Sequence, residues 1–143
     1  MKIVICGSMA FAKQMKTAKD ELESKGHKVN VPEFVEEFIK IKELEMRAKR
    51  GGGPEGAKWK MKYNLIKKHY EKIKRADAIL VLNYDKNKIK NYIGGNSFLE
   101  MGFAHILDKK IFLLRSVPSF KFYYEEILAM KPVILKGNLS KIK

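Results

Sequence analysis

The chain has 143 residues, of which 45% are hydrophobic and 32% are charged, and its formal net charge is +14. This length predicts one domain with a real hydrophobic core, and this composition excludes a disordered chain. The single cysteine, Cys6, cannot form an internal disulfide, and it excludes a multi-cysteine metal site. No apolar run approaches the roughly 20 residues of a membrane-spanning helix. Residues 1–7 lack the leader and cleavage site of a signal peptide, so we expect a cytoplasmic protein.

The positive charge favours anionic partners, either nucleic acid or phosphorylated small molecules. A solvated Lys-rich surface, as in heat-adapted proteins, explains the same charge without any partner. We favour this second explanation because lysines occur in every segment, whereas Arg, the better bidentate phosphate ligand, occurs only at positions 47, 50, 75 and 115. No helix-turn-helix, zinc-binding or RNA-binding aromatic signature is present, so nucleic-acid binding is the weaker alternative.

Short apolar runs alternate with helical patterns along the whole chain. The expected strands are residues 2–6, 27–31, 78–82, 111–114 and 132–135. The expected helices are residues 9–25, 33–50, 58–75, 97–107 and 119–130. Strands that alternate with helices imply right-handed crossovers and a parallel sheet with helices on both faces. We therefore predict a three-layer α/β domain of about five strands, and we expect the basic tail, residues 136–143, on the surface.

Gly7 and Ser8 separate the first expected strand from the first expected helix. Backbone N–H groups at a helix start, together with the helix dipole, favour an anion above the sheet. Ser8 is equally suited to a simple N-cap role. Both interpretations stay open, because a cap that faces a crevice can serve both purposes.

Three consecutive glycines and Pro54 interrupt the helical pattern, so we predict a mobile loop or lid from Gly51 to about Lys58. The next expected helix carries Trp59, Tyr63 and Tyr70 near one stripe, which favours core or dimer contacts over a row of base-stacking rings.

The most informative stretch is residues 91–105, which follows the apolar strand 78–82 and opens a helix. Gly94 and Gly95 let the backbone turn tightly and approach a ligand. Strand, glycine turn and helix start together predict a crevice at the carboxyl end of the sheet, where open α/β folds bind ligands. Glu100 is expected in the first helical turn, where it either acts in this crevice or forms a capping box with Ser97.

Three stretches together resemble the nucleoside 2-deoxyribosyltransferase superfamily, which includes the deoxynucleoside monophosphate N-hydrolases. They are Ile-Cys-Gly-Ser at 5–8, Ala-Asp-Ala-Ile-Leu-Val at 76–81 and Gly-Asn-Ser-Phe-Leu-Glu-Met-Gly-Phe-Ala at 95–104. The most specific part is the Glu-x-Gly-aromatic-Ala core that begins at Glu100. The resemblance covers most of the chain as a single domain, 1–143. It implies a flavodoxin-like strand order of 2-1-3-4-5 and a homodimer or larger assembly, in which a neighbouring subunit helps to close each site.

The resemblance also implies a chemistry. Glu100 would be the nucleophile that attacks the anomeric carbon of a deoxynucleoside or its monophosphate, and water or an acceptor base would resolve the glycosyl ester. Neither a cofactor nor a metal ion is expected. The residues expected to face the substrate are Gly7, Ser8, Met9, Gly94, Gly95, Asn96 and Ser97.

The chain departs from the family pattern at two positions. Val4 stands where family enzymes often have a tyrosine, and His69 stands roughly where they carry an aspartate near the leaving base. His69 is therefore a candidate acid at neutral pH, although a lone helical histidine is more often a packing residue. The tyrosines that could supply a missing phenol are Tyr63, Tyr84 and Tyr92. We predict an enzyme of the N-glycosidic bond, and an inactive nucleotide-binding module is the alternative.

Overall fold

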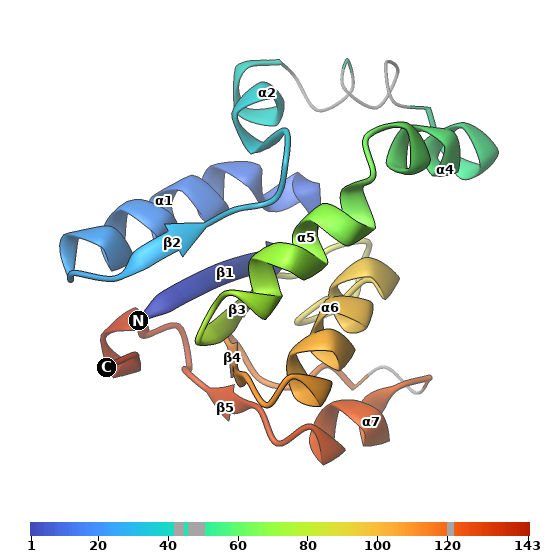
Figure 1. Cartoon of the computed structure of the whole chain (residues 1–143). Coiled ribbons are helices and arrows are strands. Elements are labelled where there is room, and N and C mark those ends of the chain that lie inside the picture. The colour runs from blue at the N-terminus through green and yellow to red at the C-terminus, as the bar shows by residue number, and fades with distance from the viewer. Residues whose placement is uncertain (42–44, 46–50, 120–121) are drawn as a thin grey trace.

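The computed structural model describes residues 1–41, 45, 51–119 and 122–143, and its centre is a five-stranded parallel sheet (Figure 1). The strands are β1 (Lys2–Gly7), β2 (Lys28–Asn30), β3 (Ala78–Leu82), β4 (Lys110–Leu113) and β5 (Val133–Ile134). Their order in the sheet is β2-β1-β3-β4-β5, and every neighbouring pair is parallel. The predicted flavodoxin-like order 2-1-3-4-5 is confirmed.

Helices cover both faces of this sheet. They are the short 3-10 helix η1 (Met9–Phe11), α1 (Ala12–Ser24), α2 (Val35–Lys40), α4 (Gly53–Lys62), α5 (Leu65–Lys74), α6 (Gly95–Ile106), α7 (Tyr124–Ala129) and the 3-10 helix η2 (Leu139–Lys141). In Figure 1, α1 lies on one side of the sheet, and α5, α6 and α7 lie on the other. Two separate apolar clusters fill these two interfaces, which confirms the predicted three layers.

Strand β1 sends successive side chains to opposite faces, as strand geometry requires. Ile3 and Ile5 belong to the cluster under α1, whereas Val4 and Cys6 belong to the cluster under α5 and α6. Because helices pack on both sides of the sheet, both faces of β1 are buried, which explains its continuous apolar sequence. Cys6 therefore points toward the same helices that carry the candidate site.

The carboxyl ends of β1 and β3 lie side by side, with Gly7 paired to Leu82. The chain leaves β1 toward α1 on one face and leaves β3 toward α6 on the other. Such a reversal of direction opens a crevice between the two connections, and open α/β sheets bind ligands there.

The predicted loop at 51–58 is wrong for residues 53–58, because they form the first part of α4. Pro54 lies in the first turn of this helix, where its missing N–H group costs no intrahelical hydrogen bond. The N–H groups of Glu55 and Gly56 bond to the carbonyl of Gly52, at 3.2 and 3.3 Å. The run of glycines and Pro54 therefore begins a helix here and does not form a loop.

Three further boundaries differ from the prediction. The helix expected over 58–75 is divided into α4 and α5, because Asn64 adopts a left-handed backbone conformation with φ 51°. The helix expected over 33–50 ends at Lys40 within the described part, and most of its remainder lies outside the described residues. The helix expected over 119–130 begins only at Tyr124, and residues 120–121 lie outside the described part.

The basic tail was expected on the surface, which is wrong for two of its residues. Leu139 and Ile142 are buried in the cluster under α1. Among the helices of the described chain, none is long and apolar enough to cross a membrane.

Gly26 ends α1 with a φ of +85°, and a Cβ at this position would have no atom within 4 Å. Gly26→Ala should therefore lower the free energy of unfolding by about 1 kcal/mol through backbone strain alone. Urea denaturation measures this change. The neighbouring variant Lys25→Ala, at a residue with φ −94°, is the control and should cost less. Equal stability of the wild type and Gly26→Ala would contradict the strain argument.

Candidate functional site

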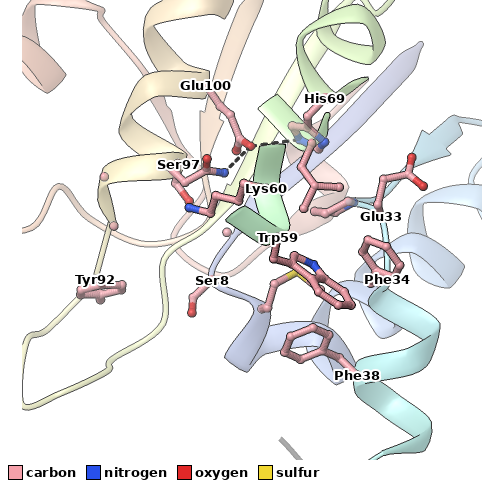
Figure 2. Close-up of a pocket in the computed structure, with 17 residues that line it drawn as sticks. Ser8, Glu33, Phe34, Phe38, Trp59, Lys60, His69, Tyr92, Ser97 and Glu100 are labelled. Atoms are coloured by element: carbon pink, nitrogen blue, oxygen red, sulfur yellow. Dashed lines mark hydrogen bonds and ion pairs between the residues drawn. The ribbon is translucent and has the colours of Figure 1, made fainter. Parts of the chain in front are cut away.

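A cavity lies at the carboxyl edge of β1 and β3, and several separate segments between the end of β1 and α6 line it (Figure 2). Its lining residues are Gly7, Ser8, Met9, Pro32, Glu33, Phe34, Phe38, Trp59, Lys60, Leu65, His69, Tyr92, Gly94, Gly95, Asn96, Ser97 and Glu100. All nine site residues predicted from the sequence are in this set, although their roles in binding and catalysis stay predictions.

Glu100 is the most deeply buried acidic group of the cavity, with 5% of its surface exposed. Its Oε1 atom accepts a hydrogen bond from the Asn96 side-chain amide at 2.8 Å. The same oxygen lies 3.5 Å from Nε2 of His69. The other oxygen, Oε2, is buried and has no hydrogen-bond partner among the described residues. An unsatisfied buried oxygen is costly, so its presence calls for an explanation.

The capping-box interpretation of Glu100 is wrong. Helix α6 begins at Gly95 with Gly94 as its N-cap, so Ser97 lies inside the helix instead of capping it. Glu100 consequently lies in the second turn and not in the predicted first turn, and its hydrogen bond goes to the Asn96 side chain. The Ser-x-x-Glu pattern is present, but the N-cap is Gly94, three residues before Ser97, so the pattern does not act as a capping box.

Burial raises the pKa of Glu100 from 4.5 to about 7. The Cys6 thiol, the Asn96 amide and the charge of Lys60 favour the carboxylate and offset part of this effect. Near neutral pH the group therefore exchanges readily between its acid and its carboxylate.

His69 is 6% exposed, and burial is the main reason that its pKa falls to about 4. The charge of Lys72 adds to this effect, whereas the charge of Glu33 opposes it. At neutral pH the imidazole is therefore uncharged, and its contact with Glu100 is a polar contact and not a full ion pair. The sequence suggested His69 as an acid at neutral pH. An uncharged imidazole argues against that role.

Cys6 also belongs to the site, although the sequence pattern did not place it there. It is fully buried, and its Sγ atom lies 3.5 Å from Nε2 of His69. Burial first, and then the charge and contact of Glu100, raise the pKa of this thiol well above its usual value. The alternation of side chains along β1 is the signal that could have placed Cys6 toward α6.

An aromatic wall closes the opposite side of the cavity, as Figure 2 shows for Phe34, Phe38 and Trp59. Phe34 and Trp59 have ring centroids 5.3 Å apart, and Tyr63 packs against both at 5.0 and 4.6 Å. Trp59 comes from α4, Phe34 is the N-cap of α2 and Phe38 lies within α2, so residues of two helices form this wall.

Two of the three candidate tyrosines lie outside the cavity lining. Tyr84 packs edge-on against Phe11 at 5.4 Å, and Tyr63 belongs to the aromatic cluster described above. Tyr92 lines the cavity beside the glycine turn. It is therefore the tyrosine that could contact a ligand.

Ser8 is an N-cap and also lines the cavity, whereas its interaction with an anion stays a prediction. Its Oγ accepts a hydrogen bond from the N–H of Ala10 at 3.3 Å, which makes it the N-cap of η1. The same oxygen accepts a hydrogen bond from Nζ of Lys86 at 2.7 Å, and the residue lines the cavity. Lys86 thus brings a positive charge to the cavity edge near Tyr92, whose ring centroid lies 5.3 Å from Nζ.

No protein-family model matches the chain, and no curated protein matches it in sequence. Among solved structures, a 2-deoxyribosyltransferase from Bacillus psychrosaccharolyticus is similar, with 22% identity, a TM-score of 0.48 and coverage of 79% of this chain and 71% of that one. The CMP N-glycosidase BcmB of Clostridium botulinum is also similar, with 15% identity, a TM-score of 0.50 and coverage of 94% and 85%. The second comparison shows a shared α/β fold along nearly the whole chain.

Glu100→Gln removes the ionisation of a group whose pKa lies at about 7 in the folded protein, against an ordinary value of 4.5. Below pH 4.5 neither protein carries the buried charge. Between pH 4.5 and about 7 the carboxyl group of the wild type ionises in the unfolded state before it ionises in the folded state, so the wild type alone loses stability, and the loss levels off above pH 7 at about 3 kcal/mol. The free energy of unfolding of the variant relative to the wild type should therefore increase by that amount between pH 4.5 and 8.5.

Urea denaturation measures this difference in the free energy of unfolding. The buffer contains a chelator, so that no metal ion binds to the carboxyl group. His69 titrates in both proteins and largely cancels. Glu126→Gln, at an exposed position of α7, is the matched control, and its difference from the wild type should stay constant with pH. A constant difference for Glu100→Gln would mean that the carboxyl group is not buried as described.

Proposed function

We propose that this protein is an enzyme that cleaves or transfers the N-glycosidic bond of a nucleoside or nucleoside 5′-monophosphate, with Glu100 as its nucleophile. The observation that carries this proposal is the buried carboxyl group of Glu100, whose Oε2 has no partner among the described residues. It lies in the wall of a cavity at the carboxyl edge of a parallel sheet. A carboxylate so placed can attack a carbon atom that a ligand brings into the cavity.

The two ends of the cavity suit the two ends of a nucleoside. The end formed by Ser8 and the glycine turn offers backbone groups and a hydroxyl, which suit a sugar or phosphate. A Cβ on Gly95 would have no atom within 4 Å, so a ligand can approach the backbone there. The aromatic wall at the other end suits a planar base. The fold shared with a CMP N-glycosidase supports the same assignment.

The proposed reaction has two steps. The carboxylate of Glu100 forms a bond to C1′ while the bond from C1′ to the base nitrogen breaks, and the base leaves with the bonding electrons and gains a proton. Water or a second base then attacks C1′, and the carboxylate is released. Asn96 and the neutral imidazole of His69 contact Oε1 of Glu100, so we assign both residues to positioning of the carboxylate.

Glu100→Gln and Glu100→Ala should each lower base release more than about 1,000-fold, because both remove the nucleophile. Chromatography of the free base from a panel of ribo- and deoxyribonucleosides and their 5′-monophosphates measures this rate. Glu126→Gln is the matched control and should keep the wild-type rate. Circular dichroism checks that each variant is folded. Unchanged turnover in either Glu100 variant would exclude the proposed mechanism.

An inactive nucleotide-binding module is the second candidate. Val4 is fully buried in the position where a family tyrosine was expected, and the buried imidazole of His69 has a pKa of about 4, which keeps it uncharged at neutral pH. Thermal-shift measurements against the same panel separate the two candidates. Stabilisation by a nucleotide without any base release would favour the module and reject the enzyme.

We also propose that the chain forms a homodimer through the outer face of α6. An apolar groove runs along this face, and its lining includes Leu99, which is 41% exposed, and Ile106, which is 80% exposed. Gly95 lines both this groove and the cavity, so a second copy bound in the groove would lie next to the site.

Ile106→Glu should shift the chain from dimer to monomer, because it would bury a charge at the proposed interface. Sedimentation velocity over a range of concentrations measures this shift. His105→Glu, which adds the same side chain at the preceding exposed position outside the groove lining, is the control. A wild-type chain that sediments as a monomer at all concentrations would reject the dimer.

A further inference from the structure

Three side chains that can each ligate a metal ion meet at the inner wall of the cavity. Cys6 comes from β1, His69 from α5 and Glu100 from α6, and at most 6% of each residue is exposed. Their ligand atoms all lie within 4.8 Å of one another. Figure 2 shows the His69 and Glu100 side chains turned toward each other at the top of the cavity.

The spacing of these atoms fits a tetrahedral cation site. Zinc bonds of about 2.3 Å to sulfur and about 2.0–2.2 Å to nitrogen or oxygen place neighbouring ligand atoms about 3.3–3.6 Å apart. Sγ of Cys6 and Oε1 of Glu100 each lie 3.5 Å from Nε2 of His69. The remaining pair, the thiol and the carboxylate, lies within 4.8 Å. The soft terminal torsion of Glu100 can close this last gap.

A second, independent observation points to a ligand at this position. Oε2 of Glu100 is buried without a hydrogen-bond partner among the described residues. A cation that the carboxylate holds through both oxygens would lie next to His69 on the Oε1 side and would also satisfy Oε2, which has no partner among the described residues. Asn96 already holds Oε1 through a hydrogen bond of 2.8 Å, and ligating carboxylates commonly have such an outer partner.

We propose that Cys6, His69 and Glu100 bind one Zn²⁺ ion or a similar borderline-soft divalent cation, with the fourth coordination position open toward the cavity. Thiolate, imidazole and carboxylate are the three ligand types that zinc prefers, and sites with three protein ligands keep one position for water or a ligand. The cation enters from the cavity, because His69 and Glu100 line it. On binding, the Cys6 thiol gives up its proton to solvent and forms the bond from sulfur to metal.

This site has a consequence for catalysis that rests on the proposed function. A carboxylate bound to a metal ion cannot attack a sugar carbon. Metal binding and base release therefore exclude each other at Glu100, and the cation acts as an inhibitor that occupies the nucleophile.

Cobalt is the most direct probe, because a bond from a thiolate to Co²⁺ gives a charge-transfer absorption band. The chain has only one cysteine, so such a band can come only from Cys6. Titration of the chelator-treated wild type with Co²⁺ should produce this band up to one equivalent, and Zn²⁺ should then abolish it. The absence of the band would overturn the proposal without any variant.

Variants test the three ligands. Competition with a coloured chelator should show that Cys6→Ser, His69→Ala and Glu100→Gln each weaken Zn²⁺ binding more than about 100-fold, beyond the effect of losing an outer partner. His105→Asn and Glu126→Gln are matched controls at exposed positions and should bind as the wild type does. Circular dichroism confirms folding. Wild-type affinity in the folded Cys6→Ser variant would also overturn the site.

One further measurement separates the metal site from the proposed function. One equivalent of Zn²⁺ should stop base release, and a chelator should restore it. A chain that binds Zn²⁺ through these ligands but releases no base keeps the metal site and overturns the proposed function. A chain that continues to release base with Zn²⁺ bound overturns the assignment of Glu100 as a metal ligand.

Discussion

The burial of the Glu100 carboxyl group is the constraint on which the rest of the site depends. Helix α6, which carries Glu100, packs on the face of the sheet to which β1 directs Cys6. The carboxyl group is therefore buried between this helix and the sheet. Asn96, four residues earlier on the same helix face, fixes one carboxyl oxygen. Burial of this group is unfavourable by itself.

Features that depend on local pattern could be predicted from the sequence. The apolar runs near β1, β3 and β4 indicate strands, and their alternation with helices indicates a parallel sheet. Parallel strands bring their carboxyl ends to one edge, so Ser8 and the glycine turn had to lie near each other. The strand order and the grouping of Glu100 with His69 came from the resemblance to a known family, because no spacing within the chain relates those distant segments.

Features that depend on tertiary environment could not be predicted. The run from Gly51 to Pro54 has the composition of a loop, but Pro54 is tolerated in the first turn of α4, which then packs its Trp59 against Phe34. The capping pattern at Ser97 failed because the helix begins earlier, at Gly95. The protonation state of a histidine likewise depends on its burial, which a sequence does not state.

The charge balance of the cluster links the two proposals. At neutral pH the His69 imidazole is uncharged, and burial opposes ionisation of the Cys6 thiol, so an ionised Glu100 has no positive partner in direct contact among the described residues. Lys60 acts on the carboxylate from the cavity side, through charge and without a hydrogen bond to it. A positively charged ligand would compensate the negative charge of this carboxylate. An oxocarbenium-like sugar carbon brings such a charge in the transition state of glycoside cleavage, and a divalent cation brings it permanently. The same uncompensated carboxylate therefore favours both the proposed chemistry and its proposed inhibition.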